Sequence, residues 1–163
     1  MTLLLALLPL ISFGQLTTST AQAPNALVQN VLLGSGVTVS NISFNGVPAT
    51  IGSFDASNTN LGIDEGIIMT TGTVQNVPGQ GPHGPNNNND AGRDNSAPGY
   101  PLLSSLIGGG TATYDAAILE FDFVPYSDSV QFNYVFGSEE YPEFVGSTFN
   151  DAFAFFISGP GIA

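Results

Sequence analysis

The sequence predicts an all-β domain, specifically a jelly-roll-like β-sandwich with long loops and one short helix. Hydrophobic side chains make up 42% of the 163 residues and charged ones only 9%, so the chain can bury one core. Its 20 glycines and 11 prolines indicate many turns between short strands. Its 12 phenylalanines are enough to fill the interior between two sheets.

Residues 1–14 are predicted to be a secretory signal peptide. The apolar run from Leu3 to Ile11 is too short to span a bilayer, although a buried helix or strand would show the same run. The segment Ser12 to Gly14 that follows carries small residues at the two positions that signal peptidase recognises. We therefore expect cleavage before Gln15 and a protein that is secreted or exposed at the cell surface.

The mature chain is expected to begin with a flexible segment, 15–25, because this stretch is polar and lacks periodicity. The sandwich domain is then assigned to residues 26–163. Its first strand is predicted between residues 37 and 44, where apolar and polar residues alternate. The dipeptide Asn45-Gly46 is typical of a tight turn and predicts a hairpin, whose returning strand is weakened by Pro48.

Three further elements are predicted in the middle of the chain. Gly66 to Thr71 contains three consecutive apolar residues, which indicates a strand buried on both faces. After a long loop over 77–100, Pro101 to Ile107 is predicted to form a short helix, since proline suits the first helical position. Ala117 to Val124 is predicted to be a strand with two different faces. Leu119, Phe121 and Phe123 lie on one of them, and Glu120 and Asp122 on the other.

Two aromatic strands that flank an acidic loop are predicted near the carboxy terminus. Alternation places Val130, Phe132, Tyr134 and Phe136 on one face of the first strand, and Phe149, Asp151, Phe153, Phe155 and Ile157 on one face of the second. A carboxylate on an apolar face is costly unless it is paired, hydrogen-bonded or bound to a cation. The chain contains a single Lys or Arg, so a bound cation is the favoured partner of Asp151.

The candidate metal ligands are Glu139, Glu140, Glu143 and Asp151. Carboxylate oxygens suit calcium, whereas a zinc-type site lacks ligands because the chain has one histidine and no cysteine. The Asn-rich tract 86–90 does not open an EF-hand, because alanines stand where that loop needs glycine and glutamate, so the site would be irregular. Two alternatives remain open. The glutamates can form a solvated loop, and Asp151 can cap loop amides.

The net charge and the missing residue types exclude several functions. A formal net charge of -12 repels phosphate backbones and anionic lipid surfaces, so nucleic acid is not an expected partner. The tyrosines are expected in strands and in the core rather than as platforms for sugar rings. An enzyme is not expected, because the carboxylates crowd one short loop and no nucleophilic cysteine or G-x-S-x-G serine is present.

Several motifs resemble a known family. They are LGIDEGIIMTTG at Leu61 to Gly72, YDAAILEFDFVP at Tyr114 to Pro125, and GSEEYPEF and FNDAFAFFISGPG between Gly137 and Gly161. In this order and spacing they resemble the choice-of-anchor L domain of bacterial secreted and surface proteins. The resemblance implies an extracellular β-rich module attached to varied carboxy-terminal sorting or anchoring signals, with no common biochemical activity.

The chain stops at Ala163, directly after an aromatic strand, so we expect the domain to be incomplete at its carboxy terminus. Further domains or a sorting signal are expected in the full-length protein. The sequence thus predicts a calcium-dependent, adhesin-like module, with glycans or cell-surface proteins as partners and no membrane span. The alternatives are a structural spacer that binds nothing and a glycoside hydrolase.

Overall fold

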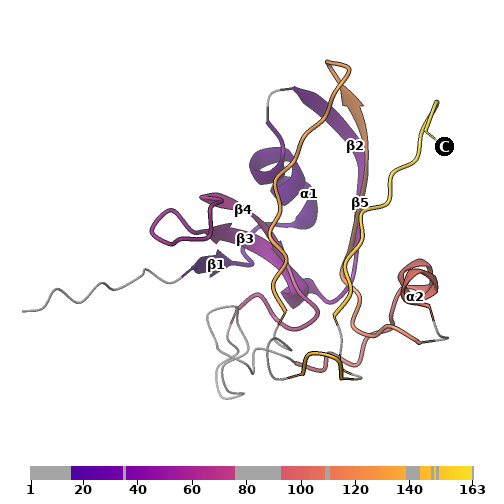
Figure 1. Cartoon of the computed structure of the whole chain (residues 1–163). Helices are drawn as coiled ribbons and strands as arrows, with labels where there is room; N and C mark the ends of the chain where they lie inside the picture. The colour runs from indigo at the N-terminus through magenta and orange to yellow at the C-terminus, as the bar shows by residue number, and fades with distance from the viewer. Residues whose placement is uncertain are drawn as a thin grey trace, which may run out of the picture.

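The fold is that of a computed structural model, which describes residues 16–34, 36–75, 93–108, 111–138, 144–147, 149 and 151–162 (Figure 1). Strands dominate the regular structure of these residues. The strands are β1 (Thr17–Ser19), β2 (Val37–Asn45), β3 (Ile51–Asp55), β4 (Glu65–Met69) and β5 (Ile118–Pro125). The helices are α1 (Pro24–Leu27), which continues as one π-helical turn over Val28–Leu32, a 3-10 turn at Pro48–Thr50, and α2 (Pro101–Ile107).

The strands form two antiparallel sheets. One sheet has the order β1-β3-β4, and the other pairs β2 with β5. The β2-β5 ladder shifts register between Ser40 and Ser43, where Asn41 adopts a positive φ of 51°. Asparagine tolerates this left-handed conformation, and its Nδ2 donates a hydrogen bond to Asp122 Oδ2 across the ladder at 2.5 Å. The all-β fold class is therefore confirmed.

The predicted hairpin after β2 is wrong. Strand β2 ends at Asn45 as expected, but the chain does not fold back on it, because Pro48 opens the 3-10 turn, in which the Thr50 N–H donates to the Val47 carbonyl at 2.9 Å. This turn sends β3 into the other sheet, between β1 and β4. The partner of β2 is β5, which lies more than 70 residues further along the sequence.

A small core lies where α1 and its π-helical turn contact the sheets. Leu27, Val28 and Val74 are fully buried and Ile51 is 3% exposed. The helical turns contact β2, β3 and β4, and Figure 1 shows α1 beside the β3-β4 ribbon. The Thr18 hydroxyl donates to the Val74 carbonyl at 2.9 Å and ties β1 to the chain that follows β4. This core is built from aliphatic residues rather than from phenylalanine.

Regular structure begins earlier than the sequence indicated. Strand β1 pairs with β3 in register from Thr17 opposite Asp55 to Ser19 opposite Ser53, inside the segment expected to be flexible. The first residues of the segment assigned to the sandwich domain are helical as far as Leu32. These short elements are held by tertiary contacts, which local periodicity does not report.

The middle of the chain follows the predictions more closely. Helix α2 covers Pro101–Ile107 as predicted and ends at Gly108, which has a φ of 74°. Strand β5 shows the predicted alternation, with its apolar face half-buried and Glu120 and Asp122 exposed. Strand β4 forms but is only half-buried, so the expectation of burial on both faces is wrong.

The predicted aromatic strands are extended but belong to neither sheet. Residues 129–137 and 151–158 have no strand assignment, and Figure 1 shows them as two long traces without strand arrows. Their phenylalanines, which we expected in a sheet-on-sheet interior, are about half exposed, because no second layer covers them in the described part of the chain. The sandwich arrangement therefore stays a prediction.

Candidate functional site

The two extended segments bring five rings together in an aromatic cluster, which consists of Phe132, Tyr134, Phe136, Phe153 and Phe155. The ring centroids of Phe132 and Phe155 lie 4.3 Å apart, and those of Tyr134 and Phe153 lie 5.7 Å apart. The rings of Phe136 and Phe153 are stacked at 6.0 Å. Residue numbers rise along one segment as they fall along the other, so the segments run in opposite directions (Figure 1). Each segment contributes every second residue, as the sequence predicted.

In the part of the chain that the structure describes, the backbones beside these rings have no hydrogen-bond partners of their own kind. Within the described residues, Val130 to Phe136 and Phe153 to Ile157 make no backbone hydrogen bonds, either with each other or with the two sheets. Two neighbouring strands of a sheet with directly opposed side chains would exchange such bonds. The contact between the two segments is thus made by side chains, and their N–H and C=O groups remain available to a partner.

The cluster is open to solvent. The exposed fraction is 55% for Phe132, 60% for Tyr134, 49% for Phe153 and 56% for Phe155. Single exposed apolar residues are common, but a contiguous group of large rings is typical of an interaction surface. This cluster therefore forms a contiguous apolar surface on the described part of the chain.

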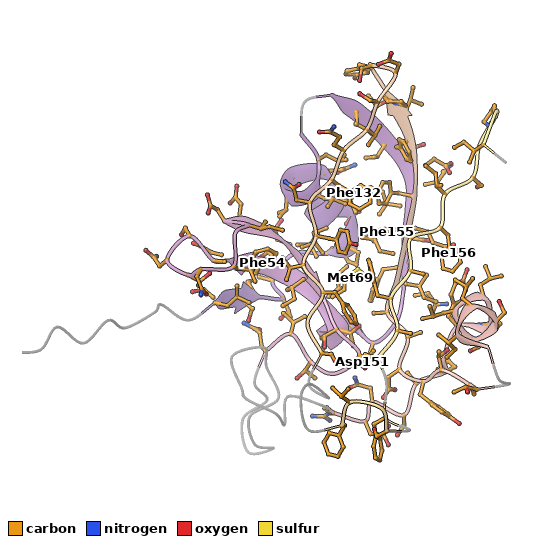
Figure 2. All side chains as sticks on the ribbon, viewed as in Figure 1. Phe54, Met69, Phe132, Asp151, Phe155 and Phe156 are labelled. Atoms are coloured by element: carbon orange, nitrogen blue, oxygen red, sulfur yellow. The ribbon has the colours of Figure 1, made fainter. Side chains whose placement is uncertain are left out.

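Phe156 lies next to the cluster in sequence and points away from it. Its ring meets the ring of Tyr100 edge-on at 5.9 Å, on the side of α2, whereas Phe155 meets Phe132 and Tyr134 (Figure 2). The two phenylalanines are almost equally exposed, at 56% and 52%. Substitutions at Phe155 and Phe156 can therefore test the two faces of the segment independently.

The predicted metal ligands are only partly placed. Glu139, Glu140 and Glu143 lie outside the described residues. Asp151 is exposed and lies toward one end of the second segment (Figure 2). Because the apolar face that carries it is itself exposed, burial alone does not require Asp151 to hold a cation, and its role as a metal ligand stays a prediction. Within the described ranges, no three His, Asp or Glu side chains gather closely enough to hold a metal ion.

Asp115 lies at the centre of a polar clamp that was not predicted from the sequence. The Asp115 carboxylate accepts hydrogen bonds from the Ala97 N–H at 2.7 Å and the Asn95 N–H at 3.0 Å. The Asn95 side chain in turn donates to the carbonyls of Thr71 and Gly72, both at 2.8 Å. The clamp therefore ties the chain after β4 to the chain before β5, and the acidic residue just before a strong strand pattern was its only signal.

An open cleft of about 680 Å³ lies beside the clamp. Its lining residues are Asp94, Ser96, Ala97, Pro98, Tyr114 and Asp115. Tyr114 is 74% exposed, so its predicted place in the core is wrong. Its backbone forms an isolated antiparallel β-bridge with Pro98, and its side chain lies on the surface.

Comparison with known proteins gives one clear result. The sequence profile of the choice-of-anchor L domain matches residues 15–163. The chain belongs to the choice-of-anchor L family. No curated protein and no solved structure shows significant similarity to it.

Membership of the choice-of-anchor L family places the chain among surface-associated modules of secreted or cell-surface proteins. The family is not an enzyme family. Among the described residues, no helix has the length and apolar character needed to cross a bilayer.

Proposed function

We propose that this choice-of-anchor L domain is an adhesin-like binding module, whose aromatic cluster contacts glycans or proteins at cell surfaces. The exposed cluster is the observation that carries the proposal. Five rings on two extended segments present a large apolar area that the other described residues do not bury. Large exposed aromatic groups of this kind dominate the energetics of recognition surfaces.

Binding of the purified protein to cells and to a glycan array tests this function. The wild-type protein should bind, and Phe155→Ser should lose most of the signal because it removes a ring from the centre of the cluster. Phe156→Ser is the matched control and should bind like wild type. If the wild-type protein binds neither cells nor glycans, the chain is a structural spacer and the proposal fails.

We further propose that calcium orders the acidic loop, with Glu139, Glu140, Glu143 and Asp151 as ligands. Support comes from the chemistry of the ligand set and from a chain with a formal charge of -12. Carboxylates that repel each other without metal gain from neutralisation. Calcium that binds only the folded protein, at a hundred times its dissociation constant, would add about 2.7 kcal/mol of stability.

Thermal melting with and without calcium tests this site. Asp151→Asn keeps the side-chain size but removes the charge, so it should abolish most of the calcium-dependent rise in Tm. Asp128→Asn is the control, because Asp128 is exposed and accepts no hydrogen bond from the described residues, whereas Asp122 accepts one from Asn41. If millimolar calcium leaves the wild-type Tm unchanged, the acidic residues form a solvated loop.

A further inference from the structure

The aromatic cluster combines two features that one class of ligand satisfies together. Its rings present apolar surface at every second residue, and the backbone beside them offers N–H and C=O groups that no other described residue pairs with. A glycan can stack on the rings, but it does not match a row of backbone donors and acceptors with a two-residue repeat. An extended polypeptide matches both, since strand addition uses backbone hydrogen bonds for affinity and alternate side chains for specificity.

The charge of the chain indicates which polypeptide fits. Asp128 precedes the first segment and Asp151 precedes the second, and the segments run in opposite directions, so one carboxylate lies toward each end of the cluster. A second copy of this chain would bring another formal charge of -12 to the contact, which opposes self-association. A strand with basic residues at both ends complements the surface.

We propose that the aromatic cluster binds an extended, apolar strand of another protein, flanked by basic residues, by strand addition to the segments 130–136 and 153–157. This inference rests on the proposed binding function and specifies its partner. The partner strand hydrogen-bonds to the unpaired backbone of these segments. Its alternate side chains, β-branched or aromatic, pack on Phe132 and Phe155, and its terminal Lys or Arg residues lie near Asp128 and Asp151.

A synthetic peptide tests the inference on the full secreted protein. The probe is an eleven-residue peptide in which a core of alternating Val and Thr is flanked by two Lys at each end. Its affinity, measured by isothermal titration calorimetry, should fall at least tenfold when alternate backbone nitrogens are methylated, because methylation removes the hydrogen-bond donors of one edge and keeps the side chains. Replacing the four Lys by Glu should weaken binding by a similar factor at low salt, and less at high salt.

Variants of the protein locate the binding surface. Phe155→Ser should raise the Kd of the peptide at least tenfold, while Phe156→Ser, which alters the opposite face, should leave it within a factor of two. Equal affinity for the methylated and unmethylated peptides would overturn strand addition, and equal effects of the two variants would overturn the assigned surface. If Phe155→Ser abolishes cell or glycan binding while no peptide binds, the proposed function stands and the strand inference fails.

Two further measurements address other occupants of the cluster. Sedimentation should show a monomer, since a dimer that Phe155→Ser dissociates would make a second copy the occupant and overturn the proposal. Hydrogen exchange of the free protein should show unprotected amides over 130–136. Slow exchange there would mean that another part of the same polypeptide already covers the cluster, which would also overturn the proposal.

Discussion

Asp115→Asn should destabilise the domain by about 2 kcal/mol, because it removes one hydrogen-bond acceptor from the polar clamp. The shape of the side chain at position 115 stays the same. The residue has a φ of 51°, a conformation that asparagine adopts as readily as aspartate, so the substitution adds no backbone strain. The native carboxylate accepts from two backbone N–H groups, at 2.7 Å and 3.0 Å. Asparagine has one acceptor oxygen, so its amide nitrogen would face the other N–H donor.

The expected loss in the free energy of unfolding follows from the hydrogen bond that the substitution removes. A hydrogen bond to a charged group contributes about 1.5–3 kcal/mol, and the partial exposure of the clamp places the expected loss toward the lower half of that range. In a domain of this size, about 2 kcal/mol corresponds to a fall in Tm of about 4–8 °C.

Thermal and urea denaturation followed by circular dichroism provide the assay. Asp128→Asn makes the same chemical change at an exposed position without a hydrogen bond from the described residues, and its Tm should stay within about 1 °C of wild type. If Asp115→Asn also melts within 1 °C of wild type, the clamp does not stabilise the fold and this reasoning is refuted.

Two other predictions concern close contacts. Gly99→Ala should destabilise the domain by about 1–3 kcal/mol in urea denaturation, because an added Cβ would lie 1.8 Å from the Thr113 carbonyl oxygen. Gly36→Ala, where the Cβ meets nothing within 4 Å, should not, and equal losses in both variants would contradict the packing argument. Asp55 has a pKa below its ordinary value of 3.8, because the Ser57 hydroxyl and then the Ser57 N–H donate to its carboxylate. Its contribution to stability is therefore present above pH 3.8 and is lost as the pH falls through the lowered pKa. Ser57→Ala should raise this pKa toward 3.8 in an NMR titration of the carboxyl carbon, and an unchanged value would show that the hydroxyl is not the cause.

The elements that the sequence predicted correctly are those with strong local signals. Proline at the first helical position and glycine after the last define α2, and strict alternation defines β5 and the face of the aromatic segments that carries the rings. The acidic loop is equally plain in the sequence, but its glutamates lie outside the described residues, so the calcium site stays a prediction.

By itself the sequence determined the all-β class, the choice-of-anchor L family and which face of each aromatic segment carries the rings. Those properties follow from composition, motifs and the two-residue period of an extended chain, all of which are local. Only the tertiary structure decided that β2 pairs with β5 and that Asp115 joins two distant loops. It also decided that the rings of the aromatic cluster are exposed, beside a backbone that is unpaired within the described residues. Strand pairing and burial depend on contacts between residues far apart in the chain. A pattern of side chains shows that a face is apolar, but it does not show what covers that face.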